Sequence, residues 1–194
     1  IELPERPGIG FGNAIASRWP IAARHPLQLP DRGDWEQRVA ASVEIEAPFA
    51  RIWVSCTHLH WRFAHGSTRE RQVVAIADQV EQLWPADGFP PILLGDFNAE
   101  PESDEIRYLK GMHSIGGRSV AFLDAWAAAG RGRWATAVDE QPGITWCNRN
   151  PYARLEVEPD RRIDYVFAGL PRRDGVGLIE ACSVVCNDEQ GGVW

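Results

Sequence analysis

Apolar and polar residues alternate along two neighbouring segments, residues 38–47 and 51–57, and this pattern predicts two β-strands. In an extended strand, every second side chain lies on the same face, so each segment has one face for a core. Pro48 lies between the two segments and is typical of a turn. The economical interpretation is a β-hairpin, preceded by a short strand over residues 11–17.

Apolar residues then recur at helical spacing between Ser67 and Pro85. Ser67 and Glu70 have the spacing of a capping box, which predicts that the helix begins there, and Pro85 ends it. The apolar face consists of Val73, Ile76, Ala77, Val80, Leu83 and Trp84. Shorter helices are predicted over residues 103–109 and 122–128.

The apolar run 91–94 predicts a buried central strand. Further strands are expected over residues 144–146, 162–167 and 176–186, with loops over 130–142 and 148–159. This order of strands and helices indicates an α/β layered domain with a mixed sheet. Without a repeat or a break in composition, the 194 residues are expected to form a single domain.

The composition narrows the classes of function. A hydrophobic content of 44% provides for one sizeable core, and no apolar stretch reaches the roughly 18 to 20 residues of a membrane span, which indicates a soluble protein. The formal charge of −7 argues against extended, non-specific binding of duplex DNA, which needs a basic face. The cysteines contain no Cys-x-x-Cys pair, which favours a reducing compartment such as the cytoplasm.

Candidate chemistry begins directly after the predicted central strand, at Gly95-Asp96-Phe97-Asn98. Asp96 and Asn98 are two residues apart, so in an extended chain they share one face and can address one small ligand together. A carboxylate and a carboxamide side by side suit water activation and binding of an oxyanion. The sequence therefore predicts a site at the mouth of this strand.

Two other strands also carry polar residues. His58 and His60 follow the strand over 51–57 and have the spacing of a His-x-His metal pair, or one is packed and the other solvated. Asp164 lies inside an otherwise apolar strand, where a carboxylate needs a partner or a function. A salt bridge to Arg161 or Arg162 is the structural alternative for Asp164.

Six short motifs, taken in order, resemble the endonuclease/exonuclease/phosphatase superfamily, which includes deoxyribonuclease I and the neutral sphingomyelinases. The motifs are residues 12–21 (Gly-Asn-Ala-Ile-Ala-Ser-Arg-Trp-Pro-Ile), Thr57-His58-Leu59, Arg69-x-x-Gln72, Gly95-Asp96-Phe97-Asn98-x-x-Pro101, Thr145-Trp146 and Arg162-Ile163-Asp164-Tyr165. Each motif is common by chance, but their order and spacing are specific. The resemblance implies a layered sandwich of mixed β-sheets flanked by helices.

The resemblance also implies hydrolysis of a phosphoester assisted by Mg²⁺, or by Mn²⁺. Asp96 would orient or deprotonate the attacking water, and Asn98 would hold a phosphate oxygen, with both at the metal site. His58 would donate to the oxyanion of the transition state, where preorganised donors have most effect. Asp164 matches an aspartate that orients a histidine near the C-terminus of the family domain.

Three further residues are candidates for contact with the substrate. Arg18 could reach a phosphate, and its alternative is a surface arginine. His60 and Trp61 follow His58 directly, and Trp61 belongs to an aromatic run that can form a rim for an apolar group. The expected substrate is a small phosphodiester or phosphomonoester, such as a lipid headgroup or a phosphorylated metabolite.

Two pieces of the family pattern are not matched. The family takes a metal-binding glutamate from upstream of residues 12–21 and a Ser-Asp-His segment from its C-terminal end. We therefore expect a fragment that is incomplete at both ends, weakly active or inactive alone, with exposed sheet edges that favour a homodimer. Two alternatives stay open: a zinc metallohydrolase that uses His58, His60 and Asp96, and a non-catalytic binding module on the same fold.

Overall fold

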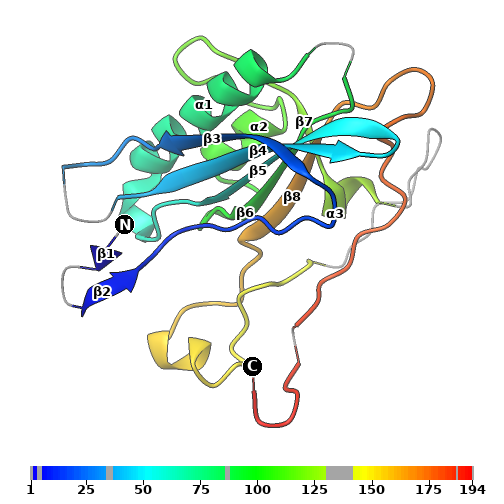
Figure 1. The fold of residues 1–194 in the computed structure, drawn as a ribbon. Helices are drawn as coiled ribbons and strands as arrows, with labels where there is room; N and C mark the ends of the chain where they lie inside the picture. Colours follow the sequence, from blue (N-terminus) through cyan, green and yellow to red (C-terminus); the bar gives the residue numbers. More distant parts are fainter. Residues whose placement is uncertain are drawn as a thin grey trace.

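The computed structural model describes residues 2–3, 6–33, 37–85, 88–129, 142–186 and 188–193. Its centre is a 6-stranded sheet with the order β3-β4-β5-β6-β8-β7 (Figure 1). The strands are β3 (Ile21–Gln28), β4 (Val39–Ala47), β5 (Ala50–His58), β6 (Ile92–Asp96), β7 (Phe122–Asp124) and β8 (Asp164–Gly169). A separate antiparallel pair is formed by β1 (Glu2–Leu3) and β2 (Arg6–Gly10).

The sheet is mixed because β5 and β6 are parallel, whereas the other neighbouring strands are antiparallel. The connection between β5 and β6 contains α1 (Gly66–Leu83), as a parallel connection requires. The other helical segments are α2 (Asp104–Leu109), α3 (Ala125–Ala128), and the 3-10 turns η1 (Phe63–His65) and η2 (Ala153–Glu156).

The core lies between one face of the sheet and helices α1 and α2. Leucine, isoleucine and aromatic side chains from both layers are buried there, because this face of the sheet and the apolar face of α1 meet. The largest buried members are Leu29, Leu59, Ile76, Leu93, Phe97, Ile106, Tyr108, Leu109 and Phe167. This layer fixes the strands that carry the candidate site.

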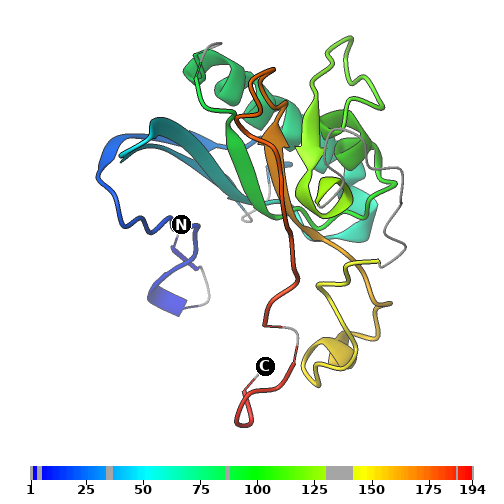
Figure 2. The same ribbon diagram turned by 90° about the vertical axis from the view of Figure 1, so that its right-hand side faces the viewer.

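The other face of the sheet is less covered and holds partly exposed apolar residues of β5, β6 and β8. Residues 182–186 lie against Leu94 and Val166 on this face. At the first residue of β4, the Val39 carbonyl accepts a hydrogen bond from the Asn13 side-chain amide over 2.8 Å. Figure 2 shows the two terminal segments on the side of the sheet away from α1.

The structure confirms the expected mixed sheet with flanking helices, including the hairpin of β4 and β5, the long helix, the central strand and the strand at Asp164. It also contains an edge strand, β3, that the sequence pattern did not predict. The expected strands over residues 11–17 and within 176–186 are wrong for the described residues, which are irregular there. The segment expected as one helix, 122–128, is divided into β7 and α3.

Two smaller predictions also need correction. The capping box is wrong, because His65 is the N-cap of α1 and no side-chain cap bond forms. The expected strand at 144–146 is a single bridge between Trp146 and Arg161. Most of the predicted loop 130–142 lies outside the described residues.

Nothing in the described part of the chain supports the expected homodimer through sheet edges. The edge strand β3 contains Pro26, which has no backbone N–H to donate to another strand. Among the helices that the structure describes, none is long and apolar enough to cross a membrane.

Candidate active site

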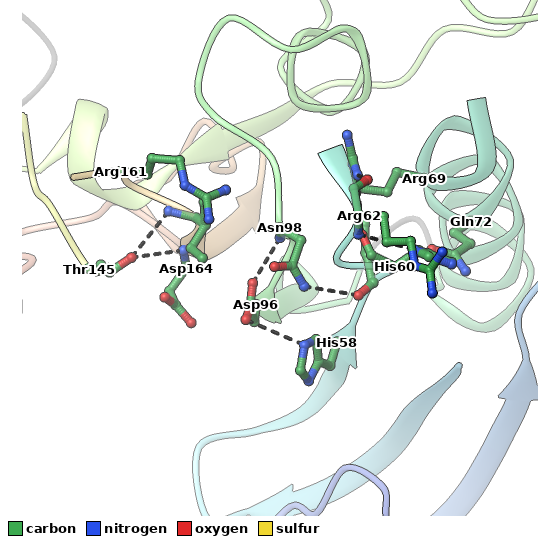
Figure 3. Close-up of polar contacts among 12 residues, drawn as sticks. His58, His60, Arg62, Arg69, Gln72, Asp96, Asn98, Thr145, Arg161 and Asp164 are labelled. Atoms are coloured by element: carbon green, nitrogen blue, oxygen red, sulfur yellow. Dashed lines mark hydrogen bonds and ion pairs between the residues drawn. The ribbon is translucent and has the colours of Figure 1, made fainter. Parts of the chain in front are cut away.

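Three polar side chains form a row across neighbouring strands at one end of the sheet. His58 of β5 is paired in register with Asp96 of β6, and Asp96 is paired with Asp164 of β8. Register partners project on the same face of a sheet, so the sheet itself brings the three residues together. Figure 3 shows His58 and Asp164 on either side of Asp96.

Gly95 permits the close approach of β5 and β6 that this row requires. Its φ of 139° is in the region that favours glycine, and a Cβ atom there would lie 1.9 Å from the Thr57 carbonyl oxygen. A side chain at residue 95 would therefore separate the two strands. The glycine directly before Asp96 is thus required by the backbone geometry of the site.

Asn98 is fixed to Asp96 and to the end of β5. Its backbone N–H donates to Oδ1 of Asp96 over 2.8 Å, and its φ is 49°. Its side-chain Nδ2 donates to the Leu59 carbonyl over 3.0 Å. Leu59 in turn donates its backbone N–H to the Asp96 carbonyl over 2.9 Å. The carboxylate and the amide are therefore held as one unit (Figure 3).

The pKa of Asp96 is raised from 3.8 to about 6, mainly because partial burial disfavours the charged carboxylate. The neighbouring Asp164 raises it further, whereas the Asn98 N–H, Arg38 and Arg161 lower it. Oδ2 of Asp96 lies 3.5 Å from Nε2 of His58. A carboxyl group with a pKa near neutrality can exchange a proton under physiological conditions, as a general base must.

Asp164 is held by the irregular segment that contains Thr145. The Thr145 hydroxyl oxygen accepts hydrogen bonds from the backbone N–H groups of Ile163 and Asp164, each over 3.1 Å. Desolvation raises the pKa of Asp164, and a hydrogen bond from Thr145 opposes this effect. The neighbouring arginines pair elsewhere: Arg162 binds Asp124 over 2.7 Å, and Arg161 binds Glu158.

His60 is not brought into the row. It is completely buried, its Nδ1 accepts the Arg62 backbone N–H over 3.3 Å, and its Nε2 lies 3.1 Å from Nδ1 of His65. The zinc set of His58, His60 and Asp96 is therefore not assembled. Among the described residues, no group of three or more His, Cys, Asp or Glu side chains is arranged to hold a metal ion.

Arg18 lies at the opposite end of the sheet. Its guanidinium is 5.7 Å from the centre of the Trp19 ring, and Trp19 contacts Phe49 in the turn before β5. The length of β5, roughly 26 Å at about 3.3 Å per residue, separates that turn from His58. Trp61 is close to His58 in sequence, is 47% exposed, and has the Arg62 guanidinium over its ring at 5.4 Å.

Two arginines lie close enough to Asp96 to lower its pKa, Arg38 and Arg161, and the sequence predicted neither as a site residue; Arg161 was expected only as a possible ion-pair partner of Asp164. Arg38 is 5% exposed, lowers the pKa of Asp96 and lies over Phe11, whose ring centre is 5.5 Å from that of His58. The predicted hairpin contained a signal for Arg38, because Ala40 pairs with Thr57 and so places residue 38 beside the end of β5. Arg161 is brought near Asp96 only by the tertiary fold, so no local sequence pattern predicts this proximity.

A cavity of about 410 Å³ opens beside Asp164 on the less covered face of the sheet. Its lining is mainly apolar, and it includes Thr145, Leu94, Val166 and the segment 182–186. Cavities of this size accommodate small organic groups. The row therefore has space beside it for part of a substrate.

The donor set of the row suits a hard divalent cation in part. The carboxylates of Asp96 and Asp164 are register neighbours, so two negative charges repel each other when both groups are ionised. A cation bound by carboxylate and amide oxygens would neutralise them, and these are the ligands that Mg²⁺ uses. Asp96, Asp164 and the Asn98 side-chain oxygen could contribute to such a site.

Solved structures of known proteins share this fold. The human Nocturnin catalytic domain with bound sulfate has a TM-score of 0.55 and 18% identity, over 78% of this chain and 48% of that one. Truncated Caenorhabditis elegans TDP2 has a TM-score of 0.58 and 16% identity, over 86% of this chain and 64% of that one. ANGEL2, described as a 2′,3′-cyclic phosphatase, has a TM-score of 0.53 and 15% identity, over 78% and 56%.

The chain thus spans between about half and two thirds of the length of these structures. No curated protein sequence matches it. The model of the Endonuclease/Exonuclease/phosphatase family matches residues 3–182, which is most of the chain. Family match, shared fold and the row at the strand ends agree, and the chain belongs to the Endonuclease/Exonuclease/phosphatase family.

Proposed function

We propose that the chain belongs to a metal-dependent phosphoesterase that hydrolyses a small phosphodiester or phosphomonoester by attack of water. The observation that carries this proposal is the register of β5, β6 and β8, which aligns His58, Asp96 and Asp164. A phosphoester is anionic, so its hydrolysis needs a positioned water, donors for the phosphate oxygens and neutralisation of charge.

In this proposal Asp96 orients the water and accepts its proton as the water oxygen bonds to phosphorus. The bond from phosphorus to the leaving oxygen breaks, and that oxygen leaves with the bonding electrons. His58 donates a hydrogen bond to a phosphate oxygen, and the second N–H of the Asn98 amide can do the same. Bound Mg²⁺ or Mn²⁺ would supply positive charge for the phosphate oxygens.

Asp164 has a supporting role in the proposal. Its carboxylate is beside Asp96 and raises the pKa of Asp96, which makes Asp96 a stronger base once it is ionised. The resemblance assigns Asp164 a histidine partner from a segment that is not matched in this sequence. We therefore expect the 194-residue chain alone to be weakly active.

A direct assay is the hydrolysis of bis-p-nitrophenyl phosphate with added Mg²⁺ by this chain and by a longer natural chain that contains it. We expect much faster turnover by the longer chain and losses of about 100-fold or more in D96N and H58Q. Arg18→Ala is the matched control, since Arg18 lies at the far end of the sheet, and it should retain activity. Equal turnover in wild type and D96N would refute the proposed role of Asp96.

Metal analysis tests the alternatives in the same preparation. Weak, reversible Mg²⁺ dependence is expected. Tightly bound stoichiometric zinc that is lost in H58A would favour the zinc hydrolase instead. A longer chain that binds phosphate esters without hydrolysing them would favour the binding module.

A further inference from the structure

The turn that directly follows β5, residues 59–65, is bound to helix α1 by an arginine and a glutamine, of which the arginine makes the most contacts. Arg69 is buried, with 6% exposure, although its side chain is charged. Its guanidinium donates to backbone carbonyl oxygens of the turn: those of His60 over 3.2 Å, Arg62 over 2.7 Å and Phe63 over 3.4 Å. A planar guanidinium presents several donors in fixed directions and can hold several acceptors at once.

A fourth hydrogen bond fixes the direction of this guanidinium. Nε of Arg69 donates to Oε1 of Glu105 in α2, which is 3% exposed. A buried charge without a partner is strongly destabilising, so the ion pair with Glu105 is what allows Arg69 to remain inside. Helices α1 and α2 together therefore set the position of the turn.

Gln72, one turn further along α1, holds the same segment from a second point. It is completely buried, accepts the His60 backbone N–H over 3.1 Å and donates to the Pro30 carbonyl over 3.0 Å. The His60 ring closes the turn by accepting the Arg62 N–H, so its Nδ1 carries no proton. These hydrogen bonds of His60 therefore hold the turn itself in place.

The turn ends in the candidate active site. Leu59, its first residue, accepts the Asn98 side-chain amide and donates to the Asp96 carbonyl. Figure 3 shows Asn98 between Asp96 and the turn that carries His60, with Arg69 and Gln72 on the far side of the turn. A shift of the turn would move the Leu59 carbonyl and with it the anchor of Asn98.

We propose that Arg69 is a positioning residue for the phosphoesterase site. Through the carbonyl groups of the turn it holds Leu59 where Asn98 needs its acceptor, so that Asn98 and His58 keep their places beside Asp96. The catalytic consequence rests on the proposed function, whereas the positioning itself does not. Mutation of a supporting contact of this kind commonly lowers activity by about 10- to 100-fold.

The test compares Arg69→Lys with Arg71→Lys in the complete natural chain. Lysine keeps the charge beside Glu105 but replaces the planar fork with a point charge. Arg71 is on the same helix, is exposed and bonds the Ser67 carbonyl, so it is the matched control. Backbone amide exchange of Leu59 and Asn98 is the first readout, and kinetic constants for bis-p-nitrophenyl phosphate are the second.

We expect exchange at Leu59 and Asn98 to accelerate by about tenfold or more in R69K, with the centre of α1 unchanged. We also expect kcat to fall about 10- to 100-fold with KM within about twofold, whereas R71K matches the wild type. Equal exchange in the two variants would overturn the proposal. So would acceleration spread evenly over α1 and the sheet, which would indicate general destabilisation.

If R69K does not fold, Glu105→Gln replaces it, because glutamine retains an acceptor while the charge is removed. The same local acceleration at Leu59 and Asn98 is expected, and its absence would overturn the proposal. If exchange changes as expected but the wild-type chain hydrolyses no phosphoester, the proposed function fails and the positioning role of Arg69 stands.

Discussion

Asp96 lies where partial burial destabilises an ionised carboxylate and raises its pKa toward the range of a general base. Burial and the neighbouring Asp164 raise its pKa to about 6, so the folded protein retains a proton there that the unfolded chain releases near 3.8. Between these values the folded state binds more protons, and its stability therefore falls as the pH rises from about 4 to about 6. At neutral pH Asp96 is mainly ionised in both the folded and the unfolded state, so nearly the whole destabilisation of the folded state is present.

Asp96→Asn should consequently raise stability at about pH 8 while it removes activity. The expected gain is about 1–3 kcal/mol, because each unit of raised pKa corresponds to roughly 1.4 kcal/mol. At about pH 4 the gain should vanish, since the wild-type carboxyl is then protonated in the folded state. Thermal unfolding at both pH values measures the effect, with the exposed Asp104→Asn as control; an equal shift at both pH values would contradict the account.

The coupling between the two carboxylates can be tested separately. Removing the negative charge with Asp164→Asn should lower the pKa of Asp96, because repulsion between the two groups is one cause of its raised value. Titration of the ¹³C-labelled carboxyl group of Asp96 by NMR measures this change. An unchanged or higher pKa in D164N would show that the two carboxylates are not coupled as described.

The pairing of β5 with β6 is the element on which the site depends. Both strands end at the row, and Gly95 lets them approach at the place where a Cβ atom would meet the Thr57 carbonyl. The hairpin of β4 and β5 adds Arg38 beside the same end. The geometry of the row is therefore a property of strand register.

Gly95→Ala should destabilise the fold by about 3–5 kcal/mol, because the methyl group meets backbone atoms and the required φ is strained for alanine. Gly12→Ala is the control, since a Cβ there meets nothing within 4 Å, and it should stay within about 0.5 kcal/mol of wild type. Urea unfolding compares the two. A G95A protein as stable as G12A would show that β5 and β6 are not this close.

Local patterns predicted the elements whose signal lies within a few residues. The alternation over β4 and β5, the periodicity of α1 and the position of Asp96 at a strand end were all predictable. His58 and His60 would share a face if the strand continued, but β5 ends at His58, and the turn carries His60 into the core. Tertiary contacts such as that of Arg69 with the turn decide this, and spacing alone does not contain them.

At the scale of the whole chain, the net charge bears on the proposed substrate. With a net charge of −7, the chain lacks the basic surplus that binding to a phosphate backbone requires. Two of the described arginines near the site are paired with carboxylates, Arg161 with Glu158 and Arg162 with Asp124. This charge agrees with the proposed small phosphate ester as substrate and argues against a long duplex.

A fluorescein-labelled DNA duplex should therefore bind with a Kd weaker than about 10⁻⁴ M at about 150 mM salt. Fluorescence anisotropy measures this binding, and a short phosphodiester that competes in the hydrolysis assay serves as the comparison. Micromolar binding of the duplex that weakens steeply with salt would contradict the expectation and indicate a nucleic-acid substrate.

In the proposed mechanism Asp96 directs a water molecule onto phosphorus. The most direct measurement is hydrolysis of bis-p-nitrophenyl phosphate in H₂¹⁸O with Mg²⁺, followed by mass spectrometry of both products. We predict one ¹⁸O atom in the p-nitrophenyl phosphate, none in the p-nitrophenol, and no labelled product above background with D96N. Label in the phenol, or equal labelled phosphate from wild type and D96N, would contradict the account.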